Sequence, residues 1–378
     1  MFGFSEFIDN NKDDMYTTLK ELAVIPAPSG NEEKRAKYVL DFLKAIGAKD
    51  AYMDSMFNVI LPINIEDSNE ITVLAAHTDI VFGYDVPLNY KEENGKILCP
   101  GIGDDTTSVV VLMYTAKYIV ENNIKPSKGL LIVLNSCEEG MGNLKGAKQL
   151  FKDFCGRIKE FVTYDSDFYS IASECVGSHR YRVTVKTEGG HSFGKFGKPN
   201  AISELSKIVS RIYRLKVPQT EGTKTTYNVG VIDGGTSVNT IAQSASMLCE
   251  YRSDSRQCLE IMNKKFMRIF RTAQTDKVTV EVEMVGERPC SNVDCTVQQE
   301  LAQKCKSVCD KVYNVGTYFR SGSTDCNIPL SMGIPAVNVG VYIGGLSHTK
   351  EEWIEKDSVL RGLLFSLKLV KELCIVNG

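Results

Sequence analysis

Two uninterrupted apolar segments constrain the fold of this chain more than any other feature of its sequence. Residues 71–76 (ITVLAA) and 129–136 (GLLIVLNS) have the length and character of buried β-strands. Polar residues follow each segment, His77 after the first and Glu138 after the second. Residues 106–122 between them have the apolar spacing of a helix. This alternation predicts an α/β fold with a mixed, mostly parallel sheet flanked by helices, and ligands bind such sheets at the carboxyl ends of their strands.

The pattern changes near residue 176 and returns to α/β character near residue 289. Residues 176–288 read as strand, helix, strand, strand, helix, strand, which is the order of a ferredoxin-like domain. We therefore expect this domain to be inserted into a larger one made of residues 1–175 and 289–378. Its expected strands are 181–187, 225–232, 244–251 and 277–284, and its helices are 200–215 and 255–273. In the larger domain we expect further helices at 13–22, 31–46, 298–312 and 356–373, and a further strand at 336–341.

The bulk properties exclude several classes of protein. The 378 residues suit two domains, and 43% hydrophobic with 24% charged residues argue against disorder. A net charge of −3 gives no field that would attract nucleic acid or an anionic membrane, so neither partner is expected. The chain has no apolar run of membrane-spanning length, and its start lacks the features of a signal peptide. We expect a cytoplasmic protein whose twelve cysteines are reduced.

His77 is the first candidate for metal binding. It ends an apolar strand, and Asp79 stands two residues on, where a carboxylate can hold an imidazole in one orientation. A buried structural histidine would fit this motif equally well if it stood alone. Asp104 lies in a loop with two glycines, PGIGDDTTS, and glycine lets a backbone approach an ion closely. The alternative for Asp104 is a helix N-cap.

Three further segments carry carboxylates or a histidine after apolar stretches. Glu138 and Glu139 follow a buried strand, so one can bind metal while the other activates water. Asp165 follows residues FVTY, and His348 follows an apolar run and a double glycine. A solvated acidic turn is the alternative for the glutamates. Together, two histidines and several carboxylates form a donor set that suits zinc.

Nine segments resemble, in order and spacing, one superfamily over nearly the whole chain. They are IPAPSGNE, HTD, GIGDDTTS, EEG, YDSD, GGHSFGKFGKPNAI, NTIA, GSTD and SHTKEEW. The superfamily contains peptidase T, carboxypeptidase G, aminoacylase and succinyl-diaminopimelate desuccinylase, which use two zinc ions. The peptidase T-like branch is the most similar.

The resemblance implies two zinc ions per subunit, with Mn²⁺ or Co²⁺ as alternatives. His77 and Asp165 would bind one ion, Glu139 and His348 the other, and Asp104 would bridge them. The resemblance also implies that Asp79 orients His77, that Glu138 is the general base, and that the Asp104–Asp105 peptide bond is cis.

The resemblance further implies a homodimer that forms through the inserted domain. His191 would then reach the active site of the neighbouring subunit and stabilise the oxyanion. Four more residues match positions that contact substrate, namely Asn239, Arg252, Ser323 and Thr324.

Hydrolysis of an amide bond in short peptides by a metal-activated water is the implied activity. Asp at position 165, where the deacylases and carboxypeptidases commonly have Glu, favours a tripeptidase or aminopeptidase. A deacylase or carboxypeptidase acting on N-acyl amino acids is the alternative enzyme. A metal- or peptide-binding protein without catalysis is the alternative of another class, but it gives no reason for Glu138 beside a ligand.

Overall fold

The computed structural model describes residues 3–66 and 68–375 and divides into two compact units. The first contains residues up to 175 and from 292 onward, and the second contains residues 176–291. Each unit has a hydrophobic core of its own. Within the described ranges, no helix is long and apolar enough to cross a bilayer.

The first unit is built on an eight-stranded sheet in the order β1-β2-β6-β3-β7-β16-β8-β15. The pairs β6–β3, β3–β7, β7–β16 and β8–β15 are parallel, and the pairs β1–β2, β2–β6 and β16–β8 are antiparallel. The expected mixed, mostly parallel sheet is therefore confirmed. The strands are β1 (Tyr52–Met53), β2 (Val59–Ile63), β3 (Ile71–His77), β6 (Gly129–Asn135), β7 (Ile158–Tyr164), β8 (Ser170–Cys175), β15 (Tyr318–Gly322) and β16 (Ala336–Val339).

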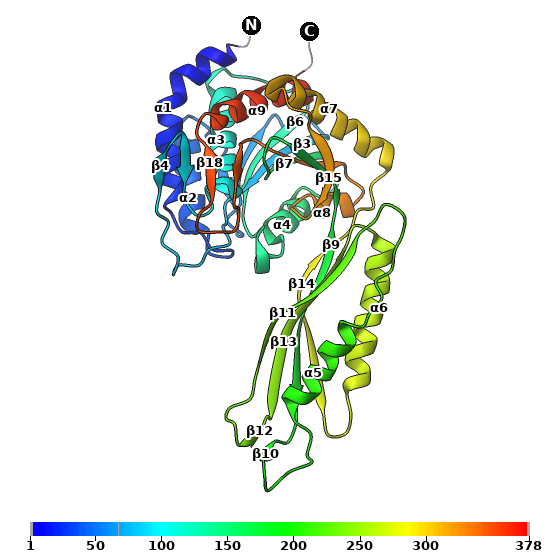
Figure 1. Cartoon of the computed structure of the whole chain (residues 1–378). Helices are drawn as coiled ribbons and strands as arrows, with labels where there is room; N and C mark the ends of the chain where they lie inside the picture. Colours follow the sequence, from blue (N-terminus) through cyan, green and yellow to red (C-terminus); the bar gives the residue numbers. More distant parts are fainter. Residues whose placement is uncertain (1–2, 67, 376–378) are drawn as a thin grey trace. The chain divides into compact units, whose positions relative to one another are not determined.

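Helices cover both faces of this sheet because successive strand residues point in opposite directions. In β3, Leu74 and Ala76 pack with one set of helices, whereas Val73 and Ala75 pack with another. The first set is α1 (Phe4–Ala23), α2 (Glu33–Ala45), α3 (Ser108–Glu121), α7 (Cys295–Tyr313) and α9 (Ser358–Cys374). The second is α4 (Lys145–Asp153) and α8 (Asn327–Ser331). Figure 1 shows α1, α3 and α9 side by side.

Several elements of the first unit differ from the expectation. Helix α1 begins at Phe4 instead of residue 13, because Phe4 and Phe7 both pack edge-on against Tyr118. A small antiparallel sheet was not expected, and its strands are too short to give a periodic signal. It consists of β4 (Lys91–Glu93), β5 (Lys96–Leu98), β17 (Gly344–Gly345) and β18 (Trp353–Glu355). The start of the predicted helix 106–122 is instead part of an irregular turn, η1 (Ile102–Thr107), which leads into α3.

The second unit has the expected βαββαβ order. It runs β9 (Gly177–Lys186), α5 (Ala201–Ile212), β11 (Thr225–Gly234), β13 (Ser244–Ser253), α6 (Arg256–Ala273) and β14 (Thr279–Arg288). The sheet order is β11-β13-β9-β14, and all three pairings are antiparallel. The two helices pack on this sheet (Figure 1). A short ribbon of β10 (Gly190–His191) and β12 (Thr240–Ile241) extends the unit.

Candidate metal centre

The five proposed metal ligands come from separate segments of the first unit. His77 is the last residue of β3, Asp165 follows β7 directly, and Glu139 stands four residues after the end of β6. Asp104 lies in η1, and His348 follows β17. Because β6, β3 and β7 are parallel neighbours, their carboxyl ends meet at one edge of the sheet.

Asp104 lies between the two histidines. Its Oδ1 atom is 3.0 Å from Nε2 of His77, and its Oδ2 atom is 3.0 Å from Nε2 of His348. The same Nε2 atom of His348 is 3.1 Å from Oε1 of Glu139. Oδ1 of Asp165 is 3.9 Å from Nε2 of His77. A carboxylate in this position offers one oxygen to each of two cations. The peptide bond that follows Asp104 is cis, as the resemblance implies.

The carboxylate of Asp79 contacts both strand ends at the centre. Nδ1 of His77 lies 3.1 Å from the backbone carbonyl oxygen of Asp79 and 3.4 Å from Oδ1 of its carboxylate. The carboxylate also accepts hydrogen bonds from the backbone N–H groups of Glu138 and Glu139, at 3.0 and 2.9 Å, and from the hydroxyl of Ser29 at 2.6 Å. Burial opposes ionisation of Asp79, but its hydrogen bonds keep the pKa below the ordinary value.

Crowded charges dominate the electrostatics of the centre. Hydrogen bonds to Asp104 and Glu139 raise the pKa of His348 to about 11. Burial opposes the charged form of His77, yet the surrounding carboxylates raise its pKa well above the ordinary value. Burial raises the pKa of Asp165 and Glu139, and repulsion by Asp104 adds to the increase.

The donor set fits divalent cations. Zinc prefers imidazole nitrogens and carboxylate oxygens. His77, Asp104 and Glu139 each offer a ligand atom, and these atoms all lie within 4.8 Å of one another. Their close spacing is unfavourable for bare carboxylates and favourable around cations, which neutralise them.

Glu138 lies beside this centre and is only 4% exposed. Burial raises the pKa of Glu139, Asp165 and Asp325, and the charge of Glu138 contributes to the increase in all three cases. The charge of Glu138 therefore acts on two of the proposed ligands, Glu139 and Asp165.

Three of the other predicted site residues lie in the second unit. His191 in β10 is exposed, and Asn239 stands just before β12, the strand that pairs with β10. Arg252 lies on β13, where its Nε atom is 2.7 Å from Oε1 of Glu250. Within this unit, His191 and Asn239 share one ribbon, and Arg252 is held in a separate ion pair.

Ser323 and Thr324 follow β15 in the first unit. Thr324 is buried, and its backbone N–H donates to Oδ1 of Asn327 at 2.9 Å. Its hydroxyl accepts a hydrogen bond of 3.2 Å from the backbone N–H of Cys326. Both groups of Thr324 thus shape the turn that begins α8.

Two buried carboxylates beside the centre had no role in the sequence analysis. Oδ2 of Asp325 accepts a hydrogen bond of 2.6 Å from Asn135, which pairs with His77 across β6 and β3. Glu352 is 1% exposed and contacts the loop of Asp104. Burial raises the pKa of each carboxylate to about 7. Both lie in segments that resemble the superfamily, GSTD and SHTKEEW. The local sequence, however, does not predict their hydrogen-bond partners.

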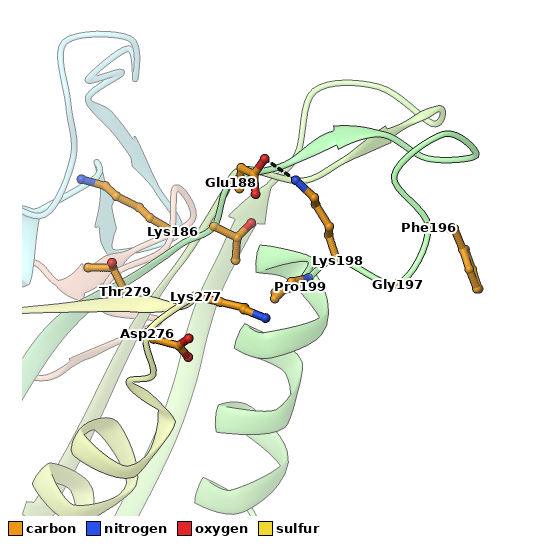
Figure 2. Close-up of a pocket in the computed structure, with 10 residues that line it drawn as sticks. Lys186, Glu188, Phe196, Gly197, Lys198, Pro199, Asp276, Lys277 and Thr279 are labelled. Carbon is orange, nitrogen blue, oxygen red and sulfur yellow. Dashed lines mark hydrogen bonds and ion pairs between the residues drawn. The ribbon is translucent and has the colours of Figure 1, made fainter.

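A cavity of about 680 Å³ lies in the second unit, and none of the predicted site residues lines it. Three lysines, Lys186, Lys198 and Lys277, are among its lining residues, together with Glu188 and Asp276. Figure 2 shows Lys198 paired with Glu188. With its lysines offset by carboxylates, this cavity shows no defined ligand chemistry.

Comparisons with known proteins identify the family of the chain. The model of the peptidase family M20/M25/M40 matches residues 73–372. Succinyl-diaminopimelate desuccinylase of Corynebacterium glutamicum is 23% identical over 344 residues, which are 88% of this chain and 89% of that protein.

Two solved structures share the fold of the chain. The aminopeptidase PepT from Bacillus cereus has a TM-score of 0.73 and 19% identity, covering 96% of this chain and 98% of that one. A tripeptidase from Staphylococcus aureus has a TM-score of 0.74 and 21% identity, covering 96% and 99%. The family model, which matches most of the chain, confirms the expected superfamily. The chain therefore belongs to the peptidase family M20/M25/M40 and is a metal-dependent peptidase or amidohydrolase.

Proposed function

We propose that this protein hydrolyses an amide bond in short peptides, with two zinc ions held at the centre described above. His77 and Asp165 would hold one ion, Glu139 and His348 the other, and Asp104 both. The observation that carries this proposal is the placement of Asp104, whose two carboxylate oxygens each lie 3.0 Å from a different imidazole nitrogen.

Glu138 is the proposed general base. When bound, the two cations would lower the pKa of a water molecule and polarise the amide carbonyl. Glu138 would take the proton from the attacking water and then give it to the leaving amine. Its position supports this role, because Asp79 holds the backbone N–H groups of Glu138 and Glu139 together. The Glu139 side chain would then bind a cation while the Glu138 side chain transfers the proton.

A homodimer formed through the second unit would complete the site. Strand β11 lies at the edge of its sheet, and it exposes Val231 and Ile232 by 53% and 57%. An edge strand with exposed apolar side chains is suited to pairing with another chain. His191 of one subunit would then donate a hydrogen bond to the oxyanion formed in the other. Asn239, Arg252, Ser323 and Thr324 remain the proposed substrate contacts.

A short peptide with a free amino terminus is the favoured substrate. Aspartate at position 165 supports the peptidase T-like branch, and an aminopeptidase and a tripeptidase share the fold. The desuccinylase relative keeps an alternative open, a deacylase or carboxypeptidase that acts on N-acyl amino acids. We propose the cytosol as the compartment, because all twelve cysteines are free.

The test is hydrolysis of a matched panel by the zinc-loaded protein. The panel contains tripeptides, the same tripeptides with acetylated amino termini, and N-acyl amino acids. We expect cleavage of the free tripeptides and little cleavage of the acetylated ones. Preference for N-acyl amino acids would instead establish the deacylase alternative. Zinc binding at two equivalents without hydrolysis of any compound would establish a binding protein and reject the enzymatic proposal.

A further inference from the structure

The carboxylate of Glu352 accepts three hydrogen bonds from one loop. Its Oε2 atom accepts the backbone N–H of Gly101 at 2.7 Å. Its Oε1 atom accepts the backbone N–H groups of Gly103 and Asp104, at 2.9 and 2.8 Å. The side chain is almost entirely buried. Three backbone N–H groups of one loop are therefore held by a single side chain, which constrains the backbone of that loop.

These contacts join two segments that each carry a proposed ligand. Glu352 stands four residues after His348 and directly before β18, whereas Asp104 lies 248 residues earlier. The backbone carbonyl of Glu352 also accepts the N–H of Cys99 at 3.1 Å. The segment of His348 is therefore attached to the loop of Asp104 through both the backbone and the side chain of one residue.

The loop itself is shaped for this close approach. Gly101 has a φ of +75°, which residues with a side chain rarely adopt. A Cβ atom on Gly103 would lie 3.0 Å from Oε1 of Glu352 and 2.9 Å from the ring of Tyr342. A side chain at position 103 would therefore crowd both Glu352 and Tyr342, whereas glycine leaves room for the close approach.

We propose that Glu352 is a positioning residue that sets the direction of the Asp104 carboxylate. By holding the N–H of Asp104 and the two glycines before it, Glu352 keeps one oxygen of Asp104 toward His77 and the other toward His348. This inference rests on the proposed function, because it gives Asp104 the role of shared ligand. Loss of the constraint lets the carboxylate turn, so both cations lose a well-placed oxygen.

The decisive experiment is a cobalt(II) titration of the metal-free protein and of its Glu352→Gln variant. Glutamine keeps the size of the side chain, but its NH₂ group meets a backbone N–H where the wild type has an acceptor. We expect cobalt affinity to fall about 10- to 100-fold, the usual effect of losing a contact that supports a ligand. We also expect the visible absorption spectrum of bound cobalt to change, since it reports coordination geometry.

A matched control separates positioning from general stability. Asp294 also accepts two backbone N–H groups, from Thr296 at 2.8 Å and Val297 at 3.4 Å, at the start of α7. Asp294→Ala removes the oxygen that accepts both N–H groups, so it should lower the melting temperature and leave cobalt affinity and spectrum unchanged. Glu352→Asp, which keeps the charge but is one methylene shorter, serves as a second variant if glutamine prevents folding.

The outcomes distinguish this inference from the proposed function. A wild-type protein that binds no cobalt overturns the metal pair and this inference with it. A wild type that binds two equivalents, with a Glu352 variant of equal affinity and spectrum, overturns the positioning role alone. Hydrogen exchange of wild-type, metal-free protein gives a check without any variant. The amides of Gly101, Gly103 and Asp104 should exchange slowly, and exchange as fast as in an exposed loop overturns the inference.

Discussion

The Nε2 atom of His348 lies 3.0 Å from the carboxylate of Asp104, although 244 residues separate the two in the chain. This contact uses the Oδ2 atom of Asp104, whereas the Oδ1 atom contacts His77. Each imidazole of the centre is therefore paired with one carboxylate oxygen of the same residue, Asp104.

Metal binding should release protons. With its pKa raised to about 11, His348 should be protonated at pH 7 in the metal-free protein. The pKa of His77 is also raised, well above the ordinary value. Ligands bind metal in their deprotonated forms, so apparent affinity should increase as pH rises. Calorimetric titration in buffers of different ionisation enthalpy measures the released protons. Identical heats in all buffers would contradict this prediction.

The same pKa shift predicts how stability of the metal-free protein depends on pH. A pKa raised from 6.5 to about 11 means that the His348 ion pairs contribute fully below pH 6.5. Their contribution is lost as pH rises toward 11. The melting temperature of the metal-free protein should fall over this range more than that of a His348→Gln variant, which lacks the titrating group. Parallel curves for the two proteins would count against these ion pairs.

Replacing Glu138 with Gln should remove turnover and leave metal content unchanged. A general acid–base group contributes about 10²- to 10⁴-fold to the rate, so kcat should fall by at least about 10²-fold. Glu139→Gln is the matched control, since Glu139 is a proposed ligand and its loss should lower zinc content. Metal analysis and steady-state kinetics together decide between the roles. Near-normal kcat for the Glu138 variant would show that another group is the base.

Asp165 and Asp167 should behave differently although they stand two residues apart. Oδ1 of Asp165 lies 3.9 Å from His77, whereas Oδ1 of Asp167 accepts the backbone N–H of Tyr169 at 3.1 Å. Asp165→Asn should weaken zinc binding by about 10- to 100-fold or more. Asp167→Asn should keep zinc binding near the wild-type value. Equal losses in both variants would mean that this pair does not divide into a ligand and a structural residue.

His191→Ala tests the shared active site. Loss of one oxyanion donor costs about 10²- to 10³-fold in kcat. An Asp104→Ala variant should be inactive for a different reason, loss of a metal ligand. Mixed dimers of the two variants would contain one intact site, so activity should partly return on mixing. Capture of one affinity-tagged variant must show that it carries the untagged one for the result to count, and mixed dimers without activity would reject the shared site.

The parallel core of the first unit could be predicted because its signal is local. The apolar runs that became β3 and β6 are continuous, since both faces of these strands are covered by helices. Strand β2 was not among the expected strands, and its Pro62 is a residue that argues against a strand. Pro62 is tolerated because β1 pairs only with Val59 and Ile60, so no strand lies beside Pro62 on that side.

Contacts between distant segments could not be predicted from the sequence. Strand β15 (YFRSG) has no alternating apolar pattern, and its parallel pairing with β8 places it in the sheet. Glu352 reads as one more acid in a polar segment. Its function follows from three backbone N–H groups about 250 residues away, which no periodicity encodes.

By itself, the sequence determined which segments form the buried strands of the core and which residue types follow them. Side-chain period and apolar content are properties of neighbouring residues, and they survive any rearrangement of the rest of the chain. The resemblance implied that Asp104 joins the ions of His77 and His348 and that Asp79 orients His77. The tertiary structure alone decided the distances between these residues and the contact of Glu352 with the loop of Asp104. Those relations depend on the order of strands in the sheet and on loops that pack across it. They arise when separate segments are brought together, because burial in one core determines which polar groups meet at its edge.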